Sequence, residues 1–246
     1  MTKTQIDRLG DRLKKGNISD DDLRLLDQYR RSFAEGYEFV VGAIRSELAL
    51  EPTGRPSKST TSISDKLRRE SIRLTQIQDI AGCRLIVTDL ANQDSVVRSL
   101  DTLFEHSTII DRRERPSHGY RAVHIVVNHG GKLIEIQVRT ALQHLWAELS
   151  EKYSDVEDPA IKYGGGSADA QGLLNDASML VKSVESSERD LADILALSLS
   201  KKTFPEELKR EIDEVQRETD ELQESQTSIK QELLSLLRRL IEVVRE

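Results

Sequence analysis

Arg115–Thr140 reads RPSHGYRAVHIVVNHGGKLIEIQVRT and predicts two strands joined by a short Gly-Gly turn. Apolar and polar residues alternate in both halves, as expected when successive side chains point to opposite faces of a sheet. This period of two places five polar side chains on one face of the hairpin. They are Tyr120, His124, Glu135, Gln137 and Arg139. Such a face is not typical of a hydrophobic core, and we interpret it as the floor of an active site.

Composition narrows the class of protein. The 246 residues are 37% hydrophobic, 32% charged and only 4% aromatic, which suggests a small globular centre with long solvated helices. A net charge of −7 argues against a generally basic nucleic-acid binder, although a local basic patch would still contact phosphates. Cys83 is the only cysteine, so an intramolecular disulfide is excluded. The sequence has no signal-peptide pattern and no apolar run of membrane-spanning length, so we expect a cytoplasmic protein without membrane association.

Residues 1–50 are predicted to form an N-terminal helical region. Residues 1–17 predict a loose, charged lead-in with one short helix at most. Ser19 and the three aspartates after it predict a helix start, because a hydroxyl caps the first turn and acids there favour the helix dipole. Apolar residues at three- and four-residue spacing then predict one amphipathic helix that runs to about Leu50 and serves packing.

Residues 51–61 contain two prolines and a glycine and predict a loop. A helix is predicted to begin near Ser62, with Asp65 at the spacing of a capping box. Basic residues crowd this region. They are Arg55, Lys58, Lys66, Arg68, Arg69 and Arg73. A helix N-terminus after a basic loop is a ready phosphate site, and a solvated charged face is the structural alternative.

Two carboxylates are placed for metal binding. Asp79 precedes the buried strand expected to reach Val87, where Gly82 permits a close backbone approach or a bulge at the strand entry. Glu135 lies on the second strand of the hairpin. Magnesium binds through one or two carboxylates together with substrate phosphates, and one carboxylate can also accept a proton. The alternative is a structural salt bridge to Arg84 or Arg139.

The sequence lacks the motifs of zinc sites and of common nucleotide-binding loops, and it leaves the role of Tyr120 open. The histidines match no zinc signature, and neither a P-loop nor a GxGxxG motif is present. Tyr120 follows Gly119, which suits a tight turn; its ring is suited to stacking on a nucleobase, and partial core packing is the alternative.

The predicted order of elements gives the fold class. Asp94 is expected to cap a helix, a strand is expected at residues 108–110, and a helix is expected from Ala141 to about Tyr153. The sequence thus predicts an α+β fold with a mixed sheet of four or five strands flanked by helices. We divide the chain into residues 1–50, a sheet-containing domain at 51–165, and a helical extension at 166–246.

The C-terminal extension carries a heptad seam of about five repeats. Its members are Leu208, Ile212, Val215, Thr219, Leu222, Gln226, Ile229, Leu233, Leu236, Leu240 and Val243. The pattern predicts a coiled coil or a helical hairpin, serving oligomerisation or docking back along residues 170–200. We expect a homo-oligomer formed through these helices.

Four ordered blocks resemble the synthetase domain of the RelA/SpoT family of ATP-dependent pyrophosphokinases. They are Lys58 with Ser62-Ile63-x-x-Lys66-x-Arg68; Asp79-x-x-Gly82-x-Arg84; Gly119-Tyr120-Arg121-x-x-His124; and Glu135-Ile136-Gln137-Val138-Arg139-Thr140. The resemblance covers Arg55–Tyr163, under half of the chain. It implies a nucleotidyltransferase-like fold and transfer of the β,γ-pyrophosphate of ATP to a ribose 3′-hydroxyl, as in guanosine tetraphosphate metabolism. We expect the family's hydrolase and ribosome-binding regulatory domains to be absent from this chain.

The resemblance also implies roles for individual residues. Catalysis would fall to Asp79, Glu135, Gln137 and Arg139, with Mg²⁺ held by Asp79 and Glu135 and with Glu135 activating the 3′-hydroxyl. ATP would be bound by Arg55, Lys58, Ser62, Lys66, Arg68 and Arg84. The acceptor would be bound by His118, Tyr120, Arg121, His124 and His144.

The sequence departs from the family pattern at two places. Arg55 stands one residue further from Lys58 than the family spacing, and Arg115-Pro116-Ser117-His118 replaces a segment that usually carries a lysine and an asparagine. The second change is similar to toxic small alarmone synthetases, some of which modify the 3′ CCA end of tRNA while others make adenosine alarmones. The implied acceptor is therefore GDP/GTP or the tRNA 3′ end, and an antitoxin protein is an implied partner. The opposing hypothesis is a catalytically silent nucleotide-binding or scaffold module, against which the two intact carboxylates argue.

Overall fold

The structure is a computed structural model that describes residues 1–200 and 206–244, with no side chains described at 195–213, 215 and 216. It divides into two compact units, each discontinuous in sequence. Unit 1 comprises residues 1–85, 95–111 and 123–138, and unit 2 comprises residues 86–94, 112–122 and 139–246. The predicted division into 1–50, 51–165 and 166–246 remains a prediction.

The short helix that the sequence allowed within residues 1–17 is present, and it is an ordered, packed helix rather than part of a loose lead-in. Helix α1 (Lys3–Lys15) starts with a capping box in which Thr2 and Gln5 exchange hydrogen bonds. It buries Ile6, Leu9 and Leu13 and packs against helix α4 (Thr60–Arg69) of the same unit. These buried apolar residues make it a core element despite its many charges.

The single helix predicted from Ser19 to Leu50 is in fact two helices. Ser19 caps α2 (Asp20–Arg31) as predicted, and α3 (Ala34–Leu48) follows after a break. At the break the Ser32 hydroxyl donates a hydrogen bond to the carbonyl of Tyr29 at 2.6 Å, and such side-chain bonds compete with helical ones. Phe33 is buried there. The apolar spacing continues across the break, which is why periodicity alone did not reveal it.

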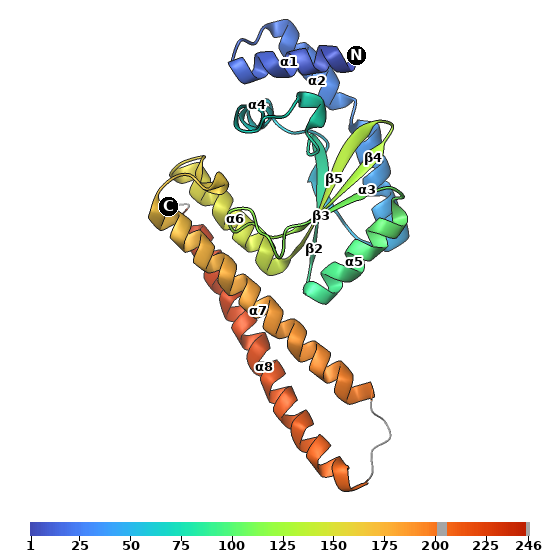
Figure 1. Cartoon of the computed structure of the whole chain (residues 1–246), viewed down its shortest axis with the longest axis vertical. Helices are drawn as coiled ribbons and strands as arrows, with labels where there is room; N and C mark the ends of the chain where they lie inside the picture. Colours follow the sequence, from blue (N-terminus) through green and yellow to red (C-terminus); the bar gives the residue numbers. More distant parts are fainter. Residues whose placement is uncertain (201–205, 245–246) are drawn as a thin grey trace. The chain divides into compact units, whose positions relative to one another are not determined.

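The central sheet confirms the predicted α+β class. Its five strands are β1 (Thr53–Arg55), β2 (Ala81–Val87), β3 (Thr108–Asp111), β4 (Val123–His129) and β5 (Lys132–Thr140). They form a mixed sheet in the order β1-β2-β5-β4-β3. The sheet is drawn in Figure 1. The β4–β5 hairpin closes through Gly130 and Gly131, both at positive φ, as its sequence predicts. β1 lies inside the predicted loop at 51–61 and pairs with β2, placing Arg55 opposite Gly82.

Two predicted helix caps are wrong. α4 begins at Thr60, capped by Ser59 rather than Ser62, because the Ser59 hydroxyl accepts the Ser62 N–H. α5 (Leu90–Leu103) begins before Asp94, and Asp89 accepts the Asn92 N–H at 2.8 Å. Asp94 lies within the helix and instead forms ion pairs with Arg113 and Arg189.

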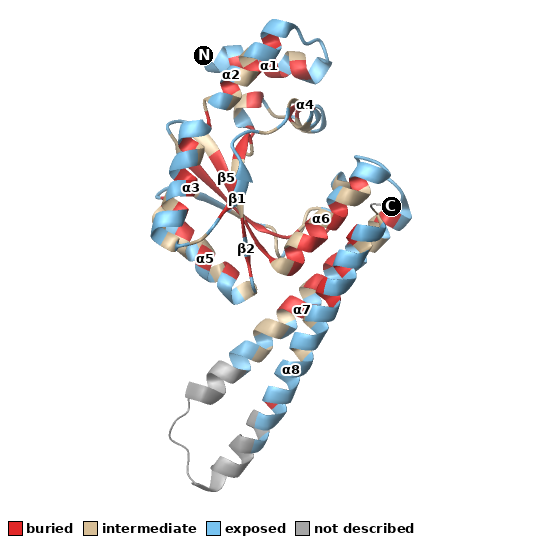
Figure 2. Ribbon diagram, turned by 180° about the vertical axis from the view of Figure 1, so that it is seen from behind, coloured by how far each residue is buried: buried red, intermediate tan, exposed pale blue. Residues whose placement is uncertain are grey.

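Unit 2 contains the long C-terminal helices α6 (Ala141–Val156), α7 (Ala168–Ser200) and α8 (Glu206–Val243). They pack against one another, and Figure 2 shows buried residues gathered where the three meet. α8 therefore docks back along α7, one of the two arrangements that the heptad seam predicted. Leu208, Ile212 and Val215 of that seam lie outside the described side chains.

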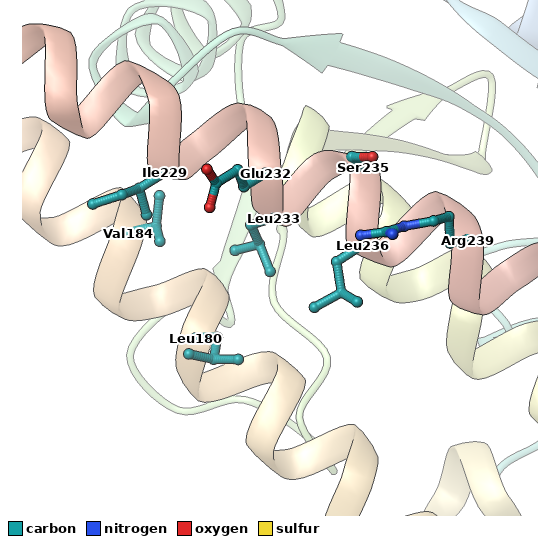
Figure 3. Close-up of a pocket in the computed structure, with 8 residues that line it drawn as sticks. All are labelled: Leu180, Val184, Ile229, Glu232, Leu233, Ser235, Leu236 and Arg239. Atoms are coloured by element: carbon teal, nitrogen blue, oxygen red, sulfur yellow. The ribbon is translucent and has the colours of Figure 1, made fainter.

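Only part of the seam is buried against the protein's own helices. Thr219 and Leu233 are buried, whereas four apolar seam residues remain exposed. They are Leu222, Ile229, Leu236 and Val243. Figure 3 shows Ile229 and Leu236 lining an apolar groove together with Leu180 of α7. Within the described part of the chain, no helix is both long and apolar enough to cross a membrane.

Candidate active site

Asp79 sits between two lysines in unit 1. Lys58 Nζ lies 2.5 Å from one carboxylate oxygen and Lys66 Nζ lies 3.0 Å from the other. The lysines come from either side of the Ser59 cap: Lys58 precedes it, with its backbone N–H bonded to the Ile80 carbonyl, and Lys66 lies on α4. The three side chains are 12% to 21% exposed, so this is a largely buried ion triad. The sequence suggested Arg84 or Arg139 as salt-bridge partners of the carboxylates. In the structure Asp79 instead pairs with Lys58 and Lys66, two residues that the resemblance assigned to ATP binding.

The triad fixes the charge of the carboxylate. Burial would raise the pKa of Asp79, but the ammonium groups of Lys58 and Lys66 outweigh it and bring the pKa to about 2. For Lys58 the balance is opposite, because burial lowers its pKa more than Asp79 raises it. The charge of Asp79 decides the protonation of the triad, because two cations stabilise this carboxylate. Lys58, in contrast, has one anion and a second cation beside it. Asp79 is therefore an ionised carboxylate.

Glu135 is the second ionised carboxylate of unit 1. One of its oxygens lies 2.9 Å from Nδ1 of His124, and the other accepts a 2.7 Å hydrogen bond from Gln137. The register pairs His124 with Gln137 across the β4–β5 ladder, which brings all three polar side chains to one face as predicted. Burial would raise the pKa of Glu135, but the hydrogen bond from His124 and its charge lower it overall. Glu135 and His124 are buried, whereas Gln137 is half-buried.

Gly82 makes the predicted close backbone approach. A Cβ at this position would lie 2.6 Å from the backbone oxygen of Glu135, so only glycine lets β2 and β5 come this near. The adjacent Cys83 is buried, and burial, followed by the charge of Glu135, raises the pKa of its thiol to about 12. Cys83 is thus a protonated core thiol rather than a nucleophile.

Asp79 and Glu135 are chemically suited to bind a magnesium ion. Both are ionised oxygen donors in the same unit, and the charge of Asp79 raises the pKa of Glu135. Among the described residues there is no group of three or more His, Cys, Asp or Glu that could hold a metal without help. Two carboxylates completed by phosphate oxygens and water is the arrangement that magnesium prefers.

The other predicted ATP ligands are Arg55, Ser62, Arg84 and Arg68, and they lie on β1, β2 and α4. Arg55 on β1 lies near enough to lower the pKa of Lys58 by its charge. Ser62 is half-buried in the first turn of α4. Arg84 lies on β2 opposite Thr53. Arg68 instead pairs with Asp65 at 3.1 Å and reaches the Lys14 carbonyl, so the structure does not bring it to the carboxylates.

Tyr120 lies in unit 2, in a tight turn rather than in the first strand. The strand begins only at Val123, because His118 and Gly119 both have positive φ and the Tyr120 N–H bonds back to the Ser117 carbonyl. Arg139 donates a 2.8 Å hydrogen bond to the Tyr120 hydroxyl, and its guanidinium carbon lies 5.0 Å from the ring centroid. The predicted tight turn is present, and the Arg139 guanidinium holds the Tyr120 ring in place.

The remaining acceptor candidates are not gathered in one place. Arg121 is buried against α7, where its Nε bonds to Ser178 at 3.1 Å. His118 packs on the loop after α6, where a Cβ on Gly164 would lie 2.4 Å from its Nδ1. His124 bonds to Glu135 in unit 1, and His144 lies on α6 with Glu148 3.9 Å away. Tyr120, Arg121 and His118 share one turn, whereas His124 serves the carboxylate.

Sequence reasoning missed three residues of unit 2 that contact this turn or the N-terminal cap of α6. They are Trp146, Ser178 and Glu185. Trp146 bonds to the Leu174 carbonyl at 2.7 Å, and Glu185 accepts hydrogen bonds from Thr140 and Gln143. Burial raises the pKa of Glu185 despite these bonds. No sequence signal marked Ser178 or Glu185, because helical periodicity does not tell a buried polar residue from an exposed one.

Comparison with known proteins agrees with this geometry. Residues 54–155 match the family model described as "Region found in RelA / SpoT proteins". An uncharacterized protein of Mycobacterium tuberculosis is 35% identical over 133 residues, covering 53% of this chain and 49% of that protein. The GTP pyrophosphokinase YjbM of Bacillus subtilis is 37% identical over 121 residues, covering 42% of this chain and 56% of that protein. The chain thus spans about half the length of the curated relatives it matches.

A solved structure extends the likeness to the fold. The crystal structure of small alarmone synthetase 1 from Bacillus subtilis is 26% identical, with a TM-score of 0.51, and the match covers 72% of this chain and 99% of that one. Residues 54–155 therefore resemble the RelA/SpoT region, the chain is similar in sequence to a GTP pyrophosphokinase, and its fold is similar to that of small alarmone synthetase 1.

Proposed function

We propose that this protein is a magnesium-dependent pyrophosphokinase. It transfers the β,γ-pyrophosphate of ATP to the 3′-hydroxyl of an acceptor ribose and releases AMP. The observation that carries the proposal is the pair of ionised carboxylates, Asp79 and Glu135, with Lys58 and Lys66 in direct contact with the first. Similarity to GTP pyrophosphokinases supports the same reaction class.

Lys58 and Lys66 act as a switch between two anions. Without ATP they neutralise Asp79, which lets three charged groups remain buried. A polyphosphate offers these lysines more negative charge than one carboxylate does, so they turn to it and free an oxygen of Asp79 for the metal. Bound magnesium supplies neutralisation of the phosphate charge. Arg55, Ser62 and Arg84 are further ATP ligands in this proposal.

Glu135 accepts the proton of the attacking 3′-hydroxyl. Its pKa is lowered, so it is ready in the ionised form, although a weak base gives limited driving force. Positioning and charge neutralisation supply most of the rate in phosphoryl-type transfer, and a weak base suffices once the oxygen begins to bond to phosphorus. His124 and Gln137 hold the two oxygens of this carboxylate, which fixes its orientation.

Tyr120 provides the stacking surface for the acceptor base, with Arg139 orienting its ring. GDP or GTP is the acceptor that we propose first, because a related protein is named a GTP pyrophosphokinase. The tRNA 3′ end, together with an antitoxin partner, is the alternative suggested by the Arg115–His118 segment.

A labelling experiment tests the proposal. ATP labelled at the γ-phosphate is incubated with magnesium and with GDP, GTP, adenine nucleotides or bulk tRNA in separate reactions. We expect label in the guanosine product, and labelling slower by about 10²-fold or more with Glu135→Gln. Label on tRNA would change the acceptor but not the reaction. Label in no acceptor would contradict the proposal and favour a silent nucleotide-binding or scaffold module.

We also propose that the exposed row on α8 mediates self-association. Leu222, Ile229, Leu236 and Val243 recur every seven residues and are 41% to 68% exposed. In an antiparallel pair centred on Leu236, Ile229 of one copy meets Val243 of the other and Glu232 comes beside Arg239. Light scattering on Ile229→Glu with Leu236→Glu should show a lower mass than the wild type. A wild-type monomer would contradict this assembly.

A further inference from the structure

Ser178 lies on α7, outside the RelA/SpoT region at 54–155, yet it contacts both neighbours of Tyr120. Its hydroxyl donates a 2.6 Å hydrogen bond to the Gly119 carbonyl and accepts a 3.1 Å bond from Nε of Arg121. A serine hydroxyl has one donor and acceptor lone pairs, so a single atom serves both contacts. The Ser178 side chain thus bonds to the residue before Tyr120 and to the residue after it.

These contacts are buried. Ser178 is 3% exposed and Arg121 is 6% exposed, so water cannot readily replace a lost bond. Arg121 also donates to the Arg113 carbonyl, and burial lowers its pKa. Removing the Ser178 oxygen would leave the buried guanidinium and the Gly119 carbonyl each short of one partner.

The turn has little room to adjust on its own. Gly119 has φ of +83°, and a Cβ there would lie 2.6 Å from Trp146 and 3.3 Å from the Ser178 side chain. The Trp146 indole is itself fixed by its bond to the Leu174 carbonyl, one helical turn before Ser178. α7 therefore meets the turn at two adjacent points, one apolar and one polar.

We propose that Ser178 is a positioning residue for the acceptor, acting through the Gly119–Arg121 turn to set the orientation of the Tyr120 ring. This inference rests on the proposed function, in which Tyr120 stacks on the acceptor base. Ser178 does not touch the acceptor. It makes the C-terminal extension part of acceptor recognition.

The test uses the full-length protein and three forms: wild type, Ser178→Ala and Ser187→Ala. Ser187 is the matched control, because it lies on the same helix, is exposed, and its hydroxyl donates a hydrogen bond to the carbonyl of Ser183. Trp146 is the only tryptophan in the chain, and its ring centroid lies 6.5 Å from that of Tyr120. Its fluorescence therefore reports GDP binding without any turnover.

We expect Ser178→Ala to raise the dissociation constant for GDP, and the KM for the acceptor, about tenfold, while the KM for ATP stays unchanged. Hydrogen exchange of the amides at 117–121 should become faster in Ser178→Ala. Ser187→Ala should match the wild type in all three measurements.

Distinct outcomes separate the two proposals. Unchanged exchange at 117–121, or faster exchange with unchanged GDP affinity, would overturn the role of Ser178. A wild type that does not bind GDP would overturn it as well. Wild-type GDP binding without transfer would contradict the proposed reaction and leave the exchange and affinity measurements to decide on Ser178.

Discussion

Replacing Asp79 by asparagine removes the central anion of the Lys58–Asp79–Lys66 triad while keeping its size. With an ordinary pKa of 3.8 in the unfolded chain and about 2 in the folded protein, the carboxylate favours the folded state. The difference corresponds to about 2 kcal/mol at pH 7, at about 1.36 kcal/mol per pKa unit. Urea unfolding followed by circular dichroism should show this loss of free energy of unfolding in Asp79→Asn.

The pH dependence identifies the cause. Because the folded-state pKa of Asp79 lies below the unfolded-state pKa, its contribution is complete above about pH 5 and disappears as the pH falls through 2. At pH 3 only about 1 kcal/mol should separate the wild type from Asp79→Asn. Asp65→Asn is the control, since Asp65 forms an exposed pair with Arg68 and should change stability by at most a few tenths of a kcal/mol. An Asp79→Asn loss no larger than the control's, or one independent of pH, would refute the electrostatic reasoning.

Three further predictions concern single positions. Glu135→Gln should lower kcat by about 10²-fold or more, with an unchanged circular dichroism spectrum, because it removes the proton acceptor; turnover near the wild-type rate would remove Glu135 from that role. Tyr120→Phe should lower kcat/KM for the acceptor about tenfold in steady-state assays, because Arg139 loses its bond to the hydroxyl, while the KM for ATP stays constant; an equal change for both substrates would contradict this division. Gly82→Ala should destabilise the fold by about 1–3 kcal/mol in urea unfolding, because its Cβ would meet the Glu135 carbonyl at 2.6 Å; unchanged stability would mean that the strands separate easily.

The sequence predicted the hairpin and its polar face well, because a period of two in Val123–Thr140 is a local property. It also indicated the close approach at Gly82. It did not predict that α1 is a packed helix: Gly10 of α1 lies against Leu74, and nothing local in a charged segment reveals a partner 64 positions away. The break at Ser32 was missed for the opposite reason, since the apolar spacing runs through it.

The candidate site was predicted in its residue types more than in its contacts. Asp79 and Glu135 were identified, but the pairing of Asp79 with Lys58 and Lys66 depends on how α4 meets the start of β2. His124 was assigned to the acceptor, whereas the strand register gives it to Glu135. Arg121 was also assigned to the acceptor. Its buried partner Ser178 lies 57 positions later, on a helix whose sequence pattern indicates only packing.

The central claim is transfer of an intact pyrophosphate, and the nucleotide left behind tests it most directly. Products of a reaction containing ATP, magnesium and the acceptor that takes label are separated by ion-exchange chromatography, and their phosphates are identified by ³¹P NMR. Transfer of the β,γ-pyrophosphate predicts AMP and a 3′-diphosphorylated acceptor in equal amounts. Formation of ADP with a singly phosphorylated acceptor, or of AMP with free pyrophosphate alone, would contradict it.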